Sequence, residues 1–261
     1  MSRDQKLKEA WEQILKMIAT RFGEGEQLNL DAIIYLIGVQ ELGKGAVEFK
    51  KDDKVNLMHI AIAGNIGAGK TSLTELLAKH YQWDPHFEDV VDNPYLDDFY
   101  NQMERWSFNL QIYFLNSRYK QVLDIRQSGK NVIQDRTIYE DAFIFAPNLH
   151  AMGLMTNRDF TNYKNLFELM EKLIAPPDLV IYLRSSIPNL VKQIHQRGRE
   201  YENSISIEYL SRLNERYEAW SQQYTKGNLL VIDVDDIDFV NKQEDLGTVI
   251  QKIDGQINGL F

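Results

Sequence analysis

Residues 64–71 read Gly-Asn-Ile-Gly-Ala-Gly-Lys-Thr and match the phosphate-binding pattern G-x-x-x-x-G-K-[ST]. Glycines at these positions let the backbone curl, so that successive N–H groups point at phosphate oxygens at a helix N-terminus. In this pattern the lysine, Lys70, reaches the β- and γ-phosphates and the hydroxyl of Thr71 binds Mg²⁺. We therefore expect a nucleotide-phosphate site at Gly64, Asn65, Ile66, Gly67, Ala68, Gly69, Lys70, Thr71 and Ser72.

The segments around this loop predict an α/β fold. Residues 59–63 (HIAIA) form a short apolar run typical of a buried parallel strand, and residues 72–81 have the leucine spacing of an amphipathic helix. Such runs and helical patterns alternate to the C-terminus, which predicts a three-layer α/β/α domain around a five-stranded parallel sheet. The other expected strands are 86–91, 131–134, 179–183 and 229–234, and the expected helices are 103–127, 156–174, 187–196, 206–225 and 246–260.

The first 57 residues differ from the rest of the chain. Apolar residues from Leu7 to Phe22 recur at helical spacing, and residues 28–42 form a second apolar helical segment before a charged connector. We therefore divide the chain into a short N-terminal helical extension, residues 1–57, and a nucleotide-binding domain, residues 58–261. The extension fits either a decoration packed on the domain or a regulatory or oligomerisation segment.

The composition indicates which partners and which cellular location to expect. The 261-residue chain has no cysteine and a net charge of −9, and no apolar run approaches the roughly 18 residues that span a membrane. This net charge argues against a nucleic-acid surface, which needs clustered Lys and Arg, although the few cations can still converge on one site. The N-terminus lacks the apolar core of a secretory signal. We expect a cytoplasmic protein without a membrane or nucleic-acid partner, and the five scattered histidines do not indicate a transition-metal site.

Polar residues at expected strand and helix ends indicate phosphoryl transfer. No glycine occurs between Gly69 and Gly129, so the D-x-x-G switch element of a GTPase has no position in this sequence. Glu88 lies in the second expected strand, and Asp135 and Arg136 follow the third. Arg197 and Arg199 end a predicted helix. Phosphoryl transfer requires a carboxylate for the attacking hydroxyl, cations for the developing charge, and oxygen ligands for Mg²⁺.

Five segments together resemble the deoxyribonucleoside kinases, particularly their bacterial deoxyadenosine/deoxyguanosine kinase branch. The resemblance covers residues 58–261, and its motifs are GNIGAGKT at 64–71, FEDVVDNPYLDDFY at 87–100, WSFNLQIYFLNSR at 106–118, QDRTIYEDAFIFA at 134–146 and RGREYE at 197–202. It implies a P-loop kinase fold and transfer of the γ-phosphoryl group of ATP, bound with Mg²⁺, to the 5′-hydroxyl of a deoxynucleoside.

The resemblance also implies individual roles. Glu88 matches the carboxylate that accepts the 5′-hydroxyl proton, and Arg136 matches the arginine beside that hydroxyl. Asp135 stands where the family often has glutamate and is expected to bind Mg²⁺ partly through water. The other matches are Tyr100 and Glu202 for the sugar 3′-hydroxyl, Gln111 for the base edge, Arg118 and Asp141 for the base pocket, and Arg197 and Arg199 for a lid over the phosphates.

The base pocket is the clue to specificity. An arginine–aspartate pair at Arg118 and Asp141 would crowd a thymine methyl group, and it presents donors and acceptors to a purine or cytosine. Unmatched buried polar groups cost about 1–3 kcal/mol each. We therefore expect deoxyadenosine to be favoured, with deoxyguanosine and deoxycytidine as possible substrates. Phe114 and Phe145 are candidates to stack on the base.

The donor side has two features of note. The segment 233–239 (DVDDIDF) resembles the loop that holds the adenine of ATP, which assigns Asp235 and Phe239 to the donor site, although a solvated acidic turn is the alternative. Relatives often have a further lid arginine where Gln193 stands, and the neighbouring Lys192 could supply the charge.

Two rival functions stay open at this point. One is a nucleoside monophosphate kinase, which would need extra cations for its acceptor phosphate. The other is a non-catalytic nucleotide-binding module, which could dispense with Glu88 and Arg136. The resemblance further implies a homodimer through helices 103–127 and 156–174, and feedback inhibition by a deoxynucleoside triphosphate.

Overall fold

The computed structural model describes residues 57–88, 93–199, 202 and 204–259. The helices expected before residue 57 therefore lie outside the described residues, and the division of the chain at residue 57 stays a prediction. The described residues all belong to the C-terminal unit.

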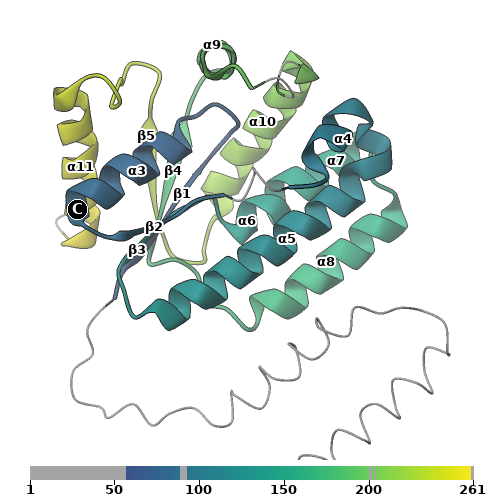
Figure 1. Ribbon diagram of the computed structural model, residues 1–261, viewed down its shortest axis with the longest axis horizontal. Coiled ribbons are helices and arrows are strands. Elements are labelled where there is room, and N and C mark those ends of the chain that lie inside the picture. The colour runs from purple at the N-terminus through teal and green to yellow at the C-terminus, as the bar shows by residue number, and fades with distance from the viewer. Residues whose placement is uncertain (1–56, 89–92, 200–201, 203, 260–261) are drawn as a thin grey trace, which may run out of the picture. The chain divides into compact units, whose positions relative to one another are not determined.

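One sheet of five parallel strands, in the order β2-β3-β1-β4-β5, forms the centre of this unit (Figure 1). The strands are β1 (His59–Gly64), β2 (Asp84–His86), β3 (Val132–Asp135), β4 (Leu179–Arg184) and β5 (Asn228–Asp233). The central strand β1 places Ala61 between Gln134 of β3 and Val180 of β4. The expected five-stranded parallel sheet is confirmed.

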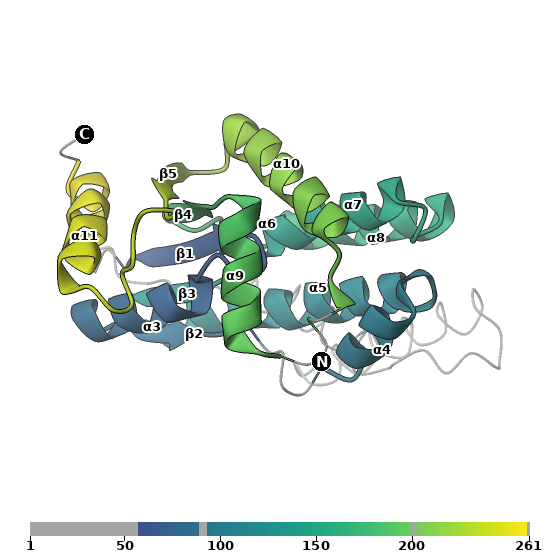
Figure 2. The ribbon, with the colours of Figure 1, turned by 90° about the horizontal axis from the view of Figure 1, so that it is seen from above.

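Helices cover both faces of the sheet, which completes three layers (Figure 2). They are α3 (Lys70–Tyr81), α4 (Leu96–Asn101), α5 (Met103–Ser128), α6 (Ile138–Glu140), the π-helix η1 (Asp141–Phe145), α7 (Ala146–Ala151), α8 (Asn157–Glu171), α9 (Ile187–Arg197), α10 (Ile207–Gln223) and α11 (Gln243–Ile257). The long helices match the sequence predictions to within one turn. The short helices α4, α6, η1 and α7 were not predicted, because pieces of three to six residues contain too little of an amphipathic period.

Two separate apolar cores result from the alternation of side chains along the strands. On one face, Ile60 and Ile62 of β1 pack with Leu73 of α3 and Ile253 of α11. On the other face, Tyr182 of β4 packs among residues from α5, α7, α8 and α10. Burial on both faces is the reason why β1 and β4 are continuous apolar runs in the sequence.

The prediction for the second strand was wrong. It placed a strand at 86–91 with Glu88 inside it, whereas β2 covers Asp84–His86 and Glu88 follows it. β2 pairs only with β3, and as an edge strand it tolerates Pro85, which has no N–H to donate. The three residues Asp-Pro-His give no apolar signal, so sequence periodicity favoured the more apolar segment that follows.

The phosphate loop provides a stability test of its own packing against α9. Gly67 has φ +85°, and a Cβ atom there would lie 2.8 Å from the carbonyl oxygen of Leu190 and 3.0 Å from Cγ1 of Ile194. We expect Gly67→Ala to lower the free energy of unfolding by about 2–5 kcal/mol, the sum of left-handed backbone strain and overpacking.

Gly129→Ala is the matched control for urea denaturation. Gly129 also has a positive φ, +64°, but a Cβ atom there meets nothing within 4 Å. Backbone strain alone should therefore cost about 1–2 kcal/mol. Equal losses for the two variants would contradict the tight packing at Gly67.

Candidate active site

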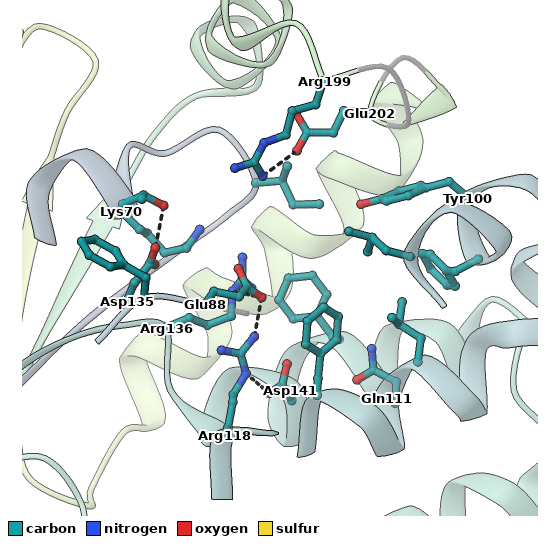
Figure 3. Close-up of a pocket in the computed structure, with 18 of the residues that line it drawn as sticks. Lys70, Glu88, Tyr100, Gln111, Arg118, Asp135, Arg136, Asp141, Arg199 and Glu202 are labelled. Atoms are coloured by element: carbon teal, nitrogen blue, oxygen red, sulfur yellow. Dashed lines mark hydrogen bonds and ion pairs between the residues drawn. The ribbon is translucent and has the colours of Figure 1, made fainter. Parts of the chain in front are cut away.

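One cavity gathers the chemically important residues that the sequence singled out (Figure 3). It lies where the phosphate loop, the end of β3, and helices α5 and η1 approach one another. Its predicted members are Ile66, Lys70, Thr71, Glu88, Tyr100, Gln111, Phe114, Arg118, Asp135, Arg136, Asp141, Phe145, Arg197, Arg199 and Glu202. Residues far apart in the sequence, from the phosphate loop to Glu202, therefore share one site.

The phosphate loop is fixed by its own side chains and by the helix behind it. The Asn65 side chain points away from the expected phosphates, because its Nδ2 donates to the carbonyl oxygen of Leu210 and to Oδ1 of Asn214, each at 3.1 Å. Nζ of Lys70 donates to the carbonyl oxygen of Asn65 at 3.0 Å. Burial, together with the nearby Arg136, lowers the pKa of Lys70 to about 8.

Thr71 and Asp135 meet at the end of the loop. The Thr71 hydroxyl donates to Oδ2 of the Asp135 carboxylate at 2.5 Å. Asp135 is buried, and within the described part of the chain its Oδ1 has no hydrogen-bond partner. Burial raises the pKa of this carboxyl group, although Lys70 opposes the shift. A buried carboxylate oxygen without a partner, beside a hydroxyl and a phosphate loop, fits the oxygen ligands that Mg²⁺ prefers.

Glu88 lies between two arginines (Figure 3). Its Oε1 is 2.5 Å from Nη2 of Arg118 and 3.5 Å from Nε of Arg136. Burial alone would raise the pKa of Glu88, but Arg136, Arg118 and Lys70 outweigh it and hold the pKa at about 2. Glu88 is therefore ionised at neutral pH and is a hydrogen-bond acceptor at the cavity.

Arg136 has an unusual backbone conformation, with φ 69°. A left-handed conformation costs a large side chain about 1–2 kcal/mol, so the surrounding structure must enforce it. A capping box directly after it begins α6, in which Thr137 and Glu140 bond each other's backbone N–H groups. The turn directs the guanidinium over the ring of Phe145, 4.6 Å from its centroid.

Arg118 and Asp141 form a buried ion pair between α5 and η1. The π-helix has a local cause. Pro147 near the start of α7 has no N–H to donate, and the N–H of Ala146 bonds to the carbonyl oxygen of Asp141, five residues back. Asp141 and Phe145 of this element both line the cavity.

One face of α5 lines the rest of the cavity. Gln111, Phe114 and Arg118 follow one another at three- and four-residue intervals and so share that face. Gln111 is buried, and its Oε1 has no hydrogen-bond partner among the described residues. A buried amide without a partner is costly unless a ligand bonds it.

The two arginines that were expected to form a lid contact the carboxylate that was expected to bind the sugar. Arg197 ends α9, and its Nε and Nη2 donate to the two oxygens of Glu202 at 3.0 and 2.5 Å. Arg199 Nη1 lies 3.6 Å from Oε1 of the same carboxylate. The expected phosphate and sugar contacts are therefore adjacent, with Tyr100 across the cavity (Figure 3).

Asp235 and Phe239, which the sequence assigned to the donor site, lie outside this cavity. They line a separate groove beside Gly67 and Ser72, together with Lys192 and Gln193. Oδ1 of Asp235 accepts from the Ser186 N–H at 2.8 Å and from the Ser185 hydroxyl at 3.0 Å, at the start of α9. The ring of Phe239 is buried against Gly69.

Sequence reasoning missed Glu140. Its buried carboxylate accepts from the Gly64 N–H at 3.1 Å, from the Thr137 N–H at 2.7 Å and from the Tyr217 hydroxyl at 2.8 Å. It thereby links the first residue of the phosphate loop to the turn that carries Arg136. In the sequence its one signal is the spacing Thr-x-x-Glu, a capping box, which indicates a helix start rather than a site.

Comparison with known proteins agrees with this site. The sequence profile described as "Deoxynucleoside kinase" matches residues 60–258. The chain belongs to the deoxynucleoside kinase family. A deoxyadenosine/deoxycytidine kinase of Bacillus subtilis is 40% identical over 197 residues, which cover 74% of this chain and 90% of that protein. A deoxyadenosine kinase of Dictyostelium discoideum is also 40% identical, over 71% of this chain and 75% of that protein.

Solved structures agree as well. A deoxyadenosine kinase from M. mycoides with bound dATP is 30% identical, with a TM-score of 0.67 over 76% of this chain and 99% of that one. This deoxynucleoside kinase is therefore an enzyme, and the expected P-loop kinase fold and family are confirmed. No helix among the described residues is long and apolar enough to cross a membrane.

The lowered pKa of Lys70 predicts an alkaline limit for binding of the triphosphate. The ammonium form that attracts phosphates is present below about pH 8 and is lost as the pH rises through that value. We expect kcat/KM for ATP to fall above pH 8. The kcat should persist to higher pH, because bound phosphates stabilise the ammonium.

Steady-state kinetics across pH test this expectation, with kcat/KM for the nucleoside at saturating ATP as the internal control. That value should follow kcat rather than the free lysine. If kcat/KM for ATP does not decline before the ordinary lysine pKa of 10.5, burial of Lys70 has no such effect.

Proposed function

We propose that this kinase transfers the γ-phosphoryl group of ATP to the 5′-hydroxyl of a 2′-deoxyribonucleoside, in nucleotide salvage. Deoxyadenosine is the favoured substrate, with deoxyguanosine and deoxycytidine as further ones. The observation that carries the proposal is the ionised Glu88, paired with Arg118 and Arg136 in the same cavity as Lys70. A carboxylate acceptor and the phosphate-binding cation are thus close together.

Glu88 is the general base in this mechanism. The sugar 5′-oxygen attacks the γ-phosphorus, the bond from that phosphorus to the β–γ bridging oxygen breaks, and the hydroxyl proton passes to the carboxylate. With a pKa of about 2 the group is ionised at neutral pH, so its oxygen is free of a proton, but it is a weak base and takes the proton only late in the reaction. Proton transfer gains force as the nucleophile becomes more acidic in the transition state.

Cations stabilise the charge that spreads over the transferred group. Arg136 Nε has no hydrogen-bond partner within the described structure and can donate to a ligand near the attacking oxygen. Lys70 serves the β- and γ-phosphates, and Arg197 and Arg199 close over them from the end of α9. Preorganised cations in a site without bulk water contribute most of the stabilisation in phosphoryl transfer.

Mg²⁺ is proposed to bind through Thr71 and, partly through water, Asp135. The hydroxyl and the unpartnered Oδ1 of Asp135 are both oxygen ligands, and the metal would neutralise phosphate charge there. The groove at Asp235 and Phe239 is proposed to take the adenine of ATP.

The acceptor side fits an unphosphorylated sugar better than a nucleoside monophosphate. Glu88 and Glu202 are carboxylates on this side, and they would repel an acceptor phosphate. Tyr100 and Glu202 are proposed to bind the 3′-hydroxyl, which favours a 2′-deoxyribose. The presence of Glu88 and Arg136 also disfavours a non-catalytic nucleotide-binding module.

The buried Arg118–Asp141 pair supports the proposed base preference. Gln111, whose amide oxygen has no partner among the described residues, lines the same cavity, as do Phe114 and Phe145. Relatives at 40% identity are named deoxyadenosine/deoxycytidine kinase and deoxyadenosine kinase. Purines and cytosine each offer an exocyclic group and a ring nitrogen for such polar partners.

We also propose a homodimer through α5 and α8. Leu169 of α8 is 62% exposed and Leu173, just after this helix, is 48% exposed, so such a contact would cover two large apolar side chains. The cytoplasmic location, the lack of nucleic-acid partners, and a regulatory or structural role for residues 1–57 stay predictions from the sequence.

Glu88→Gln tests the general base. The amide keeps the shape and a hydrogen bond to Arg118 but cannot accept the proton, so kcat with deoxyadenosine should fall by at least about 100-fold. The KM for ATP should change little. Glu168→Gln, an exposed carboxylate paired with Lys164 on α8, is the matched control and should keep full activity. Near-normal turnover of Glu88→Gln would refute the assigned role.

Joint replacement of the base-pocket pair tests specificity. Arg118→Met with Asp141→Ala removes both charges together and leaves no unpaired buried charge from this pair. We expect the ratio of kcat/KM for thymidine to that for deoxyadenosine to rise on the order of 10-fold or more. Absolute rates fall, because Arg118 also contacts Glu88, but the ratio cancels that common loss.

The control for specificity is Arg126→Met on the same helix, whose guanidinium donates to the carbonyl oxygen of Leu173 away from the cavity. Its ratio should equal that of the unmodified enzyme. An unchanged ratio in the double variant would mean that other residues select the base.

A further inference from the structure

A chain of hydrogen bonds runs from β1 to the segment that carries Glu88. Nε2 of Gln121 on α5 donates to the carbonyl oxygen of Phe87 at 2.9 Å. Nε2 of Gln134 on β3 donates to Oε1 of Gln121 at 2.7 Å. Nε2 of His59 on β1 lies 2.9 Å from Oε1 of Gln134. Two amides thus connect a strand in the middle of the sheet to the residue before Glu88.

This series of hydrogen bonds ends at a backbone carbonyl group, and that fixes which group donates in every bond. A backbone carbonyl only accepts, so Gln121 must present its NH₂ to Phe87 and its oxygen to Gln134. Gln134 must then donate to Gln121 and turn its own oxygen to His59. That oxygen also only accepts, so the proton of His59 must be on Nε2. Burial lowers the pKa of His59 to about 4, and the ring is therefore neutral at pH 7 with one N–H.

Glu88 is attached to α5 at two consecutive points. Gln121 fixes the backbone at Phe87, and Arg118, three residues earlier on the same helix, contacts the Glu88 side chain at 2.5 Å. Register pairing of β2 with β3 extends only to His86 opposite Gln134. Beyond the ladder, the Gln121 amide continues the connection between the Glu88 segment and β3.

Gln134 connects the same series of hydrogen bonds to Arg136, the second arginine beside Glu88. It is buried at 1% exposure on a strand whose preceding residues, Val132 and Ile133, are apolar. It is followed by Asp135 and then by Arg136, whose Nε lies 3.5 Å from Glu88. A buried amide has a desolvation cost that an apolar residue would avoid. Its placement sets the separation between the Glu88 segment and the strand end that carries Arg136.

We propose that Gln121 and Gln134 are positioning residues, which orient Glu88 through the Phe87 carbonyl against Arg118 and Arg136. Neither amide touches the substrate; each acts through the backbone beside the base. This inference rests on the proposed role of Glu88 as the general base.

The kinetic test starts with Gln121→Met, which keeps the length of the side chain and removes the donor. We expect kcat to fall on the order of 10-fold, with the KM for ATP unchanged, because the phosphate loop is not part of the chain. Gln121→Glu, which still accepts from Gln134 but cannot donate to Phe87, should give the same loss. Gln127→Met in the last turn of α5 is the control and should behave as the unmodified enzyme. A raised KM for ATP, or a lower melting temperature with kcat unchanged, would overturn the proposal.

Double variants show whether Gln121 and Gln134 act through one series of hydrogen bonds or affect kcat independently. If Gln134 acts through Gln121, then Gln121→Met with Gln134→Met should lose about as much kcat as Gln121→Met alone. Losses that multiply would contradict the proposal. In the Glu88→Gln background, Gln121→Met should cause no further loss. A further loss of kcat in that background would overturn the positioning role of Gln121. Near-normal activity of Glu88→Gln itself would instead overturn the role of Glu88 as the general base, so the two failures can be distinguished.

The histidine gives a readout that needs no activity. In ¹⁵N-resolved NMR spectra of the unmodified protein at pH 7, His59 should be the neutral tautomer with its proton on Nε2. Gln134→Met should remove this constraint and shift the His59 ring signals, while Gln127→Met should not. A proton on Nδ1 in the unmodified protein would mean that the chain does not exist as described.

Discussion

The structure depends on the pairing of charges that the fold removes from water. Arg118, Arg136, Glu140 and Asp141 are all nearly inaccessible, and Glu88 is only 18% exposed. A buried charge without a partner costs several kcal/mol, so each of these groups constrains the others. They come from the segment after β2, from α5, from the end of β3, and from α6 and η1. The packing of the layers brings these elements, and with them the partners of each charge, together.

The same pairing prepares the chemistry. Two guanidinium groups keep Glu88 ionised, and the carboxylate of Glu140 connects the phosphate loop to the strained turn at Arg136. Strained backbone at a site persists only when its surroundings over-determine it. Here the capping box after Arg136, the bond from Tyr217 to Glu140 and the ring of Phe145 supply that constraint. Stability and catalytic geometry thus rest on one set of contacts.

The sequence was most informative where a pattern is local. Short residue spacings predicted the phosphate loop, the apolar strands β1 and β4, and the long helices. The family motifs predicted most of the residues that line the cavity. Contacts between residues far apart in the sequence could not be predicted from such local patterns. β2 was misplaced because Asp84-Pro85-His86 has no apolar period, and Glu140 resembled an ordinary helix-cap glutamate until Gly64 and Tyr217 were placed beside it. The inward direction of the Asn65 side chain depends on α10, which is about 145 residues away in the sequence.

The ionisation of Glu88 is the most direct test of this account, because the proposed general base, its two arginine partners and the cavity meet at this carboxylate. Its carboxyl carbon can be followed by ¹³C NMR during an acid titration, with Glu88→Gln to assign the signal. The account predicts an ionised carboxylate throughout the range in which the protein stays folded, consistent with a pKa of about 2. A midpoint at or above the ordinary glutamate value of 4.5 would contradict it.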